Sequence, residues 1–477
     1  MNLYDLSQKG NLPVYEYLYK CIRDDILSGE LEAGSKLMSK RALASLYDIA
    51  IITVENAYAQ LLLEGYIYSR ERSGYYVSDI VPFVSSTDSY SPSLSVNGAD
   101  NLFHESSAKS SENTTPVIDL SQGSIKREAF PFASWAKLSR RILLDEEQNL
   151  LVAPHPQGVY KLRCAIARLL GQTKGLNVNP DNIIVGPGSE YLHQILIQLI
   201  GKSRIVAAED PGYKKVGSIF ESNGVKCIYI PVDDKGLNVK KLYDHNIKLI
   251  HTSPSHHFPT GCIMPIDRRM ELISWASSND TYIIEDDYDS EFRLSGRPIP
   301  TLVSLNADRV VYMNTFTKSM APSIRIAYAV LPDALMDIYR KKLSFYSGAV
   351  SSFDQYTLAA FIDEGYFERH ISRMRNYYKK LRDDIISIFN SSELNKVATL
   401  KEEHAGLHFI LRINLNIDDT QFINRLREKD IALKALSDYC YHKTNRYDHC
   451  FIINYGNADK ESFRMAVSTI LDTLKGM

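Results

Sequence analysis

Apolar residues recur every three or four positions in three short segments near the start of the chain, a spacing typical of amphipathic helices. A proline opens the first segment, a serine precedes the second, and glycines end the first and the third, as is usual at helix ends. These segments are 13–28, 40–47 and 54–65. Two stretches of alternating residues follow, 66–69 and 75–78, and predict a β-hairpin. Three helices and a hairpin predict a winged helix-turn-helix over residues 1–79, with its third helix in the major groove of DNA.

Residues 80–116 lack such a pattern and are rich in Ser, Asn and Thr. A stretch of this composition buries too little apolar surface to order itself, so the sequence predicts a flexible linker. Its length corresponds to an average span of about 33 Å. That span is close to the roughly 34 Å between DNA half-sites one helical turn apart.

Short apolar strands alternate with helical patterns from residue 117 onward, as in an α/β domain with a mainly parallel sheet. We therefore expect a second domain over residues 117–477. Its last part, from about residue 332, is expected to form a smaller lobe together with residues 117–151. The strands of the sheet are expected at 183–185, 204–207, 226–230, 249–252, 282–284 and 310–313.

The composition adds limits on partners and compartment. The chain has 477 residues, enough for two or three domains, and no apolar run long enough to span a bilayer, so no membrane partner is expected. A formal net charge of −2 excludes a protein that coats nucleic acid but allows a local basic surface. The six cysteines show no Cys-x-x-Cys spacing, which indicates reduced thiols in a cytoplasmic protein.

Two polar motifs follow neighbouring strands of the expected sheet. Residues 285–292 read EDDYDSEF, and residues 315–325 read TFTKSMAPSIR. A carboxylate at one strand end and Lys318 at the next suit pyridoxal phosphate, because the lysine forms a Schiff base with the aldehyde and the acid keeps the pyridine nitrogen protonated. Either motif alone is equally consistent with a solvated loop, but together and in this order they favour the cofactor. The groups expected to bind its phosphate are Thr315, Thr317 and Arg325.

These two motifs resemble the fold-type I aminotransferase domain of MocR-type regulators, which belong to the GntR superfamily and include a GABA-responsive member. The resemblance covers nearly all of the chain apart from the linker. It implies that Asp286 pairs with the pyridine nitrogen and Tyr288 with the ring hydroxyl, although Asp287 or Asp289 could replace Asp286. It also points to Ser189 and Glu190, which follow a Gly-Pro-Gly turn, as phosphate-binding residues, and to Tyr213 as the aromatic that stacks on the ring. The alternative for Tyr213 is a core aromatic.

The N-terminal segments LMSKRALA (37–44), TVENAY (53–58), LEGY (63–66) and RSG (72–74) resemble GntR-type DNA-binding domains. The resemblance implies DNA contacts from Ser39, Lys40, Arg41, Thr53 and Gly74. The basic residues expected around the same face are Lys36, Lys40, Arg41, Arg70 and Arg72.

Two observations weaken this prediction of DNA binding. Ala50 and Ile51 stand where the family usually has Ser-Arg, which removes a helix cap and a DNA contact. Residues 1–79 also contain eight Lys and Arg against eleven Asp and Glu, so few cations are available for phosphates. The alternative is a helical module that binds protein.

The segment HHFPTG (256–261) departs from the aminotransferase pattern, which has an asparagine directly before Pro-Thr-Gly. Phe258 cannot make the hydrogen bond of that asparagine to the ring hydroxyl. The adjacent histidines suggest no metal site, because neighbouring side chains project in different directions and no other ligands cluster nearby.

We therefore expect a DNA-binding transcription regulator whose second domain binds pyridoxal phosphate and senses an amino compound or the cofactor itself. The expected partners are a double-stranded DNA operator with two half-sites, a small amino-compound effector and a second copy of the chain. The alternatives are an active aminotransferase with an accessory DNA-binding domain, and a repressor whose second domain only dimerises. An arginine of the smaller lobe would bind an effector carboxylate, and the candidates are Arg412, Arg427 and Arg446.

Overall fold

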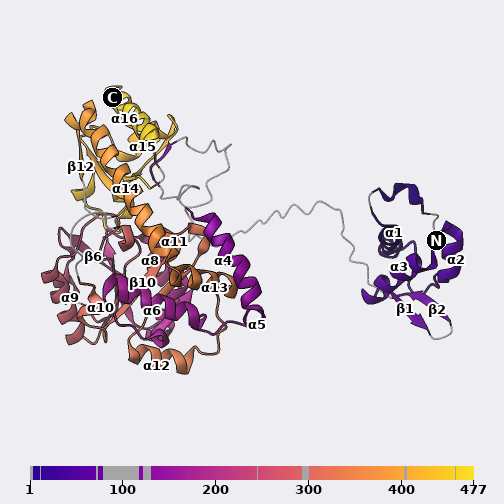
Figure 1. Cartoon of the computed structure of the whole chain (residues 1–477). Helices are drawn as coiled ribbons and strands as arrows, with labels where there is room; N and C mark the ends of the chain where they lie inside the picture. The colour runs from indigo at the N-terminus through magenta and orange to yellow at the C-terminus, as the bar shows by residue number, and fades with distance from the viewer. Residues whose placement is uncertain are drawn as a thin grey trace, which may run out of the picture. The chain divides into compact units, whose positions relative to one another are not determined.

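The structure is a computed structural model that forms two compact units, Met1–Lys109 and Ser110–Met477 (Figure 1). The expected linker, 80–116, lies outside the residues that the structure describes, as does Arg72. The first unit has its last described strand at Val77, and the second has its first at Ile118. The described residues are 4–10, 12–70, 73–78, 118–121, 130–243, 245–292, 300–401, 406–456 and 458–476.

The first unit is the predicted winged helix-turn-helix. Its core is formed by apolar residues at helical spacing, among them Leu18, Ile22 and Val54, none of which is exposed. The Ser39 hydroxyl accepts a hydrogen bond from the Ala42 amide, so this serine caps the second helix as expected. The elements are α1 (Val14–Ser28), α2 (Lys40–Tyr47), α3 (Ile51–Leu63), β1 (Ile67–Arg70) and β2 (Gly74–Val77), with β1 and β2 paired antiparallel.

The second unit contains an eight-stranded sheet with the order β4-β11-β10-β9-β8-β5-β6-β7. The five central strands from β10 to β6 are parallel, as predicted, whereas β11 and β7 pair antiparallel with their neighbours. The bounds are β4 (Ile183–Gly186), β5 (Ile205–Asp210), β6 (Lys226–Asp233), β7 (Gly236–Leu237), β8 (Ile247–Thr252), β9 (Tyr282–Asp286), β10 (Val310–Thr315) and β11 (Ala327–Val330).

Helices cover both faces of this sheet, because successive residues of a buried strand point to opposite sides. On β10, Val311 and Met313 pack in one apolar cluster with α7, α8 and α12, whereas Val310 and Tyr312 pack in another with α6, α9 and α13. The helices are α4 (Phe132–Asp145), α5 (Glu147–Leu150), α6 (Tyr160–Lys174), α7 (Ser189–Ile200), α8 (Lys214–Ser222), α9 (Ile266–Ser278), α10 (Leu302–Leu305), α11 (Phe316–Ser319), α12 (Asp333–Lys342) and α13 (Ser352–Asp363).

The smaller lobe has a four-stranded sheet, β12-β13-β16-β15, and lies at the upper end of the second unit in Figure 1. The expectation that it includes residues 117–151 holds for β3 (Ile118–Asp119), which pairs with β14 (Ile431–Ala432), but is wrong for α4, which packs on α13. It is also wrong for α12, which packs on α7, and for α13 itself, which packs on α6 beside the large sheet. The other elements are α14 (Tyr366–Ser391), β12 (Ala398–Lys401), β13 (His408–Ile413), α15 (Asp419–Arg427), β15 (Lys434–Ala435), β16 (Cys450–Asn454) and α16 (Lys460–Lys475).

Candidate functional site

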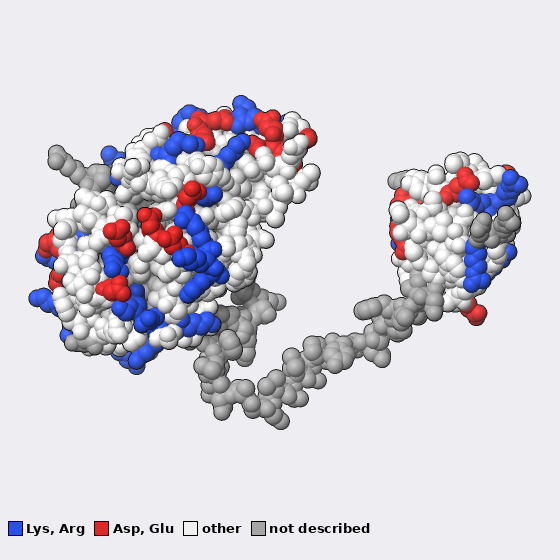
Figure 2. Space-filling model, turned by 90° about the horizontal axis from the view of Figure 1, so that it is seen from below, with Lys and Arg blue, Asp and Glu red and all other residues white. Residues whose placement is uncertain are grey.

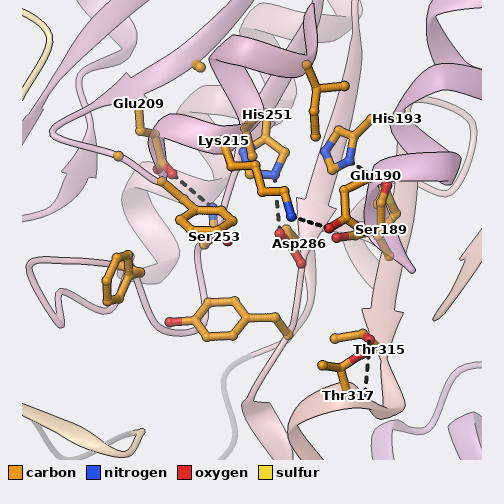
Figure 3. A pocket seen from close by; sticks show the side chains of 18 of the residues that line it. Ser189, Glu190, His193, Glu209, Lys215, His251, Ser253, Asp286, Thr315 and Thr317 are labelled. Carbon is orange, nitrogen blue, oxygen red and sulfur yellow. Dashed lines mark hydrogen bonds and ion pairs between the residues drawn. The ribbon is translucent and has the colours of Figure 1, made fainter. Parts of the chain in front are cut away.

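A cavity of about 250 Å³ lies at the carboxyl ends of β5, β8, β9 and β10, beside the start of α7 (Figure 3). The carboxyl edge of a parallel sheet is where ligands bind in open α/β folds. All nine residues that the sequence suggested for the cofactor line this cavity: Ser189, Glu190, Tyr213, Asp286, Tyr288, Thr315, Thr317, Lys318 and Arg325.

Lys318 reaches the cavity from the short helix α11, which begins directly after β10. The Thr315 hydroxyl caps this helix by accepting a hydrogen bond from the Thr317 amide at 3.1 Å, and the two hydroxyl oxygens are 2.8 Å apart. The chain then turns back toward β11, which runs antiparallel to β10. Arg325 lies in this turn, just before β11, and also lines the cavity. One strand–helix–strand turn therefore supplies the amine, two hydroxyls and a guanidinium.

The opposite wall is the first turn of α7, where free backbone N–H groups and the helix dipole favour an anion. Gly188 precedes it with φ of 100°, and a Cβ there would collide with the Arg325 guanidinium, so only glycine fits. Arg325 Nη2 lies 2.6 Å from Glu190 Oε2, and Lys215 bonds the other carboxylate oxygen. Burial alone would raise the pKa of Glu190, but these two cations outweigh it and hold the pKa at about 2.

Asp286 is the member of the acid cluster that faces the cavity. His251 Nε2 lies 3.3 Å from Asp286 Oδ2, and the His251 ring lies 5.2 Å from that of His193, centroid to centroid. His193 Nδ1 is in turn 2.7 Å from the Ser189 carbonyl oxygen. Burial lowers the pKa of His193 to about 4, so this histidine is neutral near pH 7 and donates to that carbonyl. Two histidines thus connect Asp286 to the start of α7.

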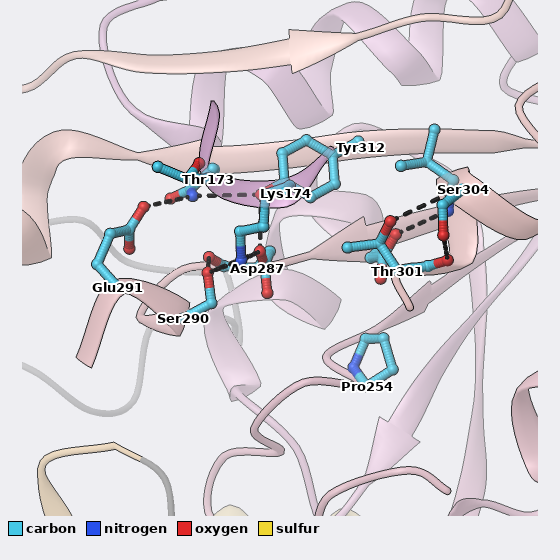
Figure 4. A network of polar contacts seen from close by, with 12 residues as sticks. Thr173, Lys174, Pro254, Asp287, Ser290, Glu291, Thr301, Ser304 and Tyr312 are labelled. Carbon is cyan, nitrogen blue, oxygen red and sulfur yellow. Dashed lines mark hydrogen bonds and ion pairs between the residues drawn. The ribbon is translucent and has the colours of Figure 1, made fainter. Parts of the chain in front are cut away.

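The two alternative acids have partners away from this cavity, and Figure 4 shows those of Asp287. Asp287 Oδ2 accepts hydrogen bonds from Lys174 at 2.8 Å and from Tyr312 at 2.6 Å. Burial would raise the pKa of Asp287, but Lys174 lowers it. Asp289 Oδ2 lies 2.7 Å from His256 Nδ1. Neither acid lines the cavity.

Aromatic side chains form another wall. Tyr213 is 52% exposed and is therefore not a core aromatic. Its ring meets Phe258 edge-on at 6.1 Å, and Phe258 also packs edge-on against Tyr439 and His408. Burial, with Asp289 and Asp286 nearby, raises the pKa of Tyr288 well above its usual value, so its hydroxyl stays protonated.

Seven further polar or aromatic residues line the cavity and were not found from the sequence: His193, Glu209, Lys215, His251, Ser253, Asn314 and Tyr441. A signal existed for His251, which stands in the apolar strand β8 beside β9 and so near the acid cluster. The arginines proposed for an effector carboxylate, Arg412, Arg427 and Arg446, do not line the cavity, and Arg446 pairs with Asp234 at 2.6 Å.

The predicted DNA face brings cations together around the wing. Arg70 lies 4.8 Å from the Tyr76 ring and Lys36 lies 6.0 Å from it, while Lys40 lies 5.5 Å from the Tyr75 ring. Lys40 also bonds Glu55 of α3 at 3.0 Å. Figure 2 shows Lys and Arg side chains gathered along one side of this unit. Helix α3 begins at Ile51, and Ala50 before it provides no side-chain cap, the consequence expected of the missing serine.

His256 and His257, which stand side by side in the sequence, lie in the described part of the chain. The adjacent histidines have separate partners, since His256 contacts Asp289 and His257 Nδ1 lies 2.7 Å from the Thr260 hydroxyl. No group of three or more His, Cys, Asp or Glu among the described residues is arranged to hold a metal. None of the described helices is both long and apolar enough to cross a bilayer.

Comparison with solved structures identifies the fold of the second unit. The Pyrococcus horikoshii kynurenine aminotransferase is 24% identical, covers 76% of this chain and 92% of its own, and superposes with a TM-score of 0.66. The Thermus thermophilus α-aminoadipate aminotransferase LysN is 20% identical and covers 75% of this chain and 92% of its own, with a TM-score of 0.65. The unit therefore has the fold-type I aminotransferase architecture.

Sequence comparison covers both units. Residues 115–470 match the aminotransferase class I and II family, and residues 14–77 match the gntR family of bacterial regulatory proteins. The HTH-type transcriptional regulator YdeL of Bacillus subtilis is 36% identical over 92% of both chains. The probable rhizopine catabolism regulatory protein MocR of Rhizobium meliloti is 30% identical over 98% of this chain and 94% of its own. The chain belongs to the MocR-type HTH transcription regulators, in which a GntR domain is joined to a domain of the aminotransferase class.

Proposed function

We propose that this transcription regulator binds pyridoxal phosphate in the 250 Å³ cavity and responds there to an amino compound. The observation that carries the proposal is the convergence on one cavity of Asp286, from the end of β9, with Lys318 and Arg325, from the turn between β10 and β11. When bound, the cofactor supplies an aldehyde that reacts with amines and a ring that withdraws electrons.

The residues present fit each part of that molecule. The first turn of α7 with Ser189, the Thr315 and Thr317 hydroxyls and Arg325 would bind the phosphate. Glu190 would act by holding Arg325 in place, since its carboxylate already bonds that guanidinium. At the other end Asp286, oriented by His251, would hold the proton of the pyridine nitrogen. The exposed ring of Tyr213 would cover the pyridine face, and Tyr288 would donate to the ring hydroxyl.

The effector would be a small primary amine that competes with Lys318 for the cofactor. A ligand shifts a conformational equilibrium only if it binds the two states with different affinity, and the cavity borders elements of both lobes. The printed name of a relative suggests a second signal: the Corynebacterium glutamicum regulator PdxR, 26% identical over 95% of this chain, is a pyridoxine biosynthesis regulator. If this protein responds to that second signal, the cofactor itself would be the molecule that it senses.

Catalytic turnover would be slow at most. Phe258 lies at the cavity wall and offers no hydrogen-bond donor, so the ring hydroxyl would lack one partner that an aminotransferase supplies. Keto-acid product measured with common amino-acid donors is expected to accumulate slowly or not at all. Rapid multiple turnover would favour the alternative, an active aminotransferase with an accessory DNA-binding domain.

Borohydride trapping followed by peptide mass spectrometry tests the site. Incubation with pyridoxal phosphate and reduction should place the added mass on the peptide that contains Lys318. The Lys318→Ala variant should lose both the added mass and the visible absorbance, whereas Lys202→Ala, which changes an exposed lysine outside the cavity, should keep them. Label on other lysines, with Lys318→Ala unchanged, would contradict the proposal.

A further inference from the structure

The exposed side of the recognition helix α3 is apolar at its N-terminal end. Ile51 is 45% exposed and Ile52 is 60% exposed, although the opposite side of the same helix is fully buried in the domain core. Ile52, Asn56 and Ala59 follow at intervals of four and three residues, so they form one exposed stripe. Residues at this end of a recognition helix are the ones that contact base edges.

The side chains of this stripe suit some DNA bases better than others. Guanine is usually read in the major groove by Arg or Lys, adenine by Asn or Gln, and the thymine C5-methyl group by apolar side chains. Helix α3 contains no Arg or Lys along its whole length. Its charged residue, Glu55, is paired with Lys40 at 3.0 Å. The helix therefore presents groups that suit A·T pairs and none of the cations that read guanine.

The cations of the expected DNA face lie outside α3, and Lys40 is tied to this helix by its ion pair with Glu55. Lys40 belongs to the first turn of α2, and Lys36 and Arg70 pack on the tyrosines of the wing. An apolar strip bordered by cations complements the major groove, where base edges lie between two rows of phosphates. This charge arrangement favours DNA over an apolar protein partner, for which the flanking cations would have to be desolvated.

We propose that Ile51 and Ile52 read the methyl groups of thymines and that Asn56 pairs with an adenine in each operator half-site. This specificity rests on the DNA-binding function of the family and adds to it the sequence class of the target. The half-site then contains A·T pairs under the N-terminal end of α3. The isoleucine at position 51, where the family usually has arginine, therefore changes the DNA sequence that is preferred and also removes one contact.

Deoxyuridine substitution tests this proposal, because it removes the C5-methyl group of thymine and leaves base pairing intact. Operators are first selected from a random DNA pool with the full-length protein, and the affinity is then measured by fluorescence anisotropy. Replacing a contacted thymine should weaken binding about fourfold, the value of burying one such group. In the Ile52→Ala variant the same replacement should have no further effect, because the methyl group has already lost its partner.

Leu63→Ala is the matched control. Leu63 is 88% exposed at the other end of α3, so this variant should bind the operator as the unchanged protein does and keep its sensitivity to deoxyuridine. Selected operators with G·C pairs under α3, or equal affinity for thymine and uracil DNA, would overturn the readout while leaving DNA binding intact. Ile51→Ala and Ile52→Ala variants that bind DNA normally but change the oligomeric state would overturn it in favour of a protein contact. Failure to select any DNA would overturn the DNA-binding function itself.

Discussion

Three neighbouring carboxylates at the end of β9 and directly after it have three different surroundings. Asp286 faces the cavity, Asp287 is buried beside Lys174, and Asp289 contacts His256. The sequence located the cluster but not the member, because the partners that distinguish these acids come from α6, from β8 and from the loop after β8, far away along the chain. The lysine turn was easier to predict, since Thr315, Lys318 and Arg325 lie within eleven residues of one another.

Arg325→Ala should weaken the binding of pyridoxal phosphate by about tenfold or more, since a charge-assisted hydrogen bond is worth roughly 1.5–3 kcal/mol. Titration of the apo-protein, followed by visible absorbance, measures the affinity. Arg204→Ala removes an exposed arginine outside the cavity and should leave it unchanged. Equal affinities for all three proteins would exclude Arg325 from the phosphate site.

His193 should make the second unit sensitive to acid. Its folded pKa of about 4 lies below the unfolded value of about 6.5, so between these values the unfolded chain binds more protons and stability falls as the pH falls. The loss amounts to about 3 kcal/mol at the lower end, from about 1.4 kcal/mol per pKa unit.

Glu285 acts in the opposite direction, because burial raises its pKa to about 7 and it gains protons on folding in the same range. The informative quantity is therefore the difference between His193→Gln and the unchanged protein in urea unfolding at several pH values. That difference should shift in favour of the variant as the pH falls from 6.5 to 4. Parallel stability curves would show that His193 titrates alike in both states.

At the scale of elements, the amphipathic helices and apolar parallel strands were predicted because their pattern is local. Strand β11 was missed because two of its four residues are alanines, which are depleted in strands, whereas the equally short and buried β4 is rich in isoleucine and valine. Helices α4, α12 and α13 were assigned to the wrong lobe for another reason. An apolar face indicates that a helix packs, but not which sheet it packs against.

Helix α3 lacks a cap, and restoring one should stabilise the DNA-binding unit. Ala50 already has the extended backbone of an N-cap, with φ −63° and ψ 138°. In Ala50→Ser a hydroxyl would accept from a free amide of the first turn, which contributes about 0.5–2 kcal/mol. Thermal unfolding of the first unit should therefore move to higher temperature. Ala59→Ser, at an exposed position inside the same helix, should move it slightly lower, and a rise in both variants would exclude capping as the cause.

At the scale of the whole molecule, we expect the regulator to bind DNA as a dimer. One DNA-binding unit has few cations, so a single contact should be weak, whereas two joined units make the second contact intramolecular. The affinity for an operator with two half-sites should exceed that for one half-site by tenfold or more. Arg41→Ala should lower both affinities and reduce the salt dependence by about one phosphate contact. Equal affinity for one and two half-sites, in anisotropy titrations, would contradict a dimeric mode of binding.

Helix α14 runs unbroken for 26 residues, about 39 Å at the standard rise. Near its start, His370 Nε2 lies 2.7 Å from the carbonyl oxygen of Ser319, the residue after Lys318, and Phe367 packs on Phe316. Its far end is buried against α16 of the smaller lobe. A stiff rod with one end on the lysine turn acts as a lever: a small rotation there becomes a much larger displacement at the distant end. A rotation of the lysine turn would therefore be enlarged at the smaller lobe by the length of α14 alone.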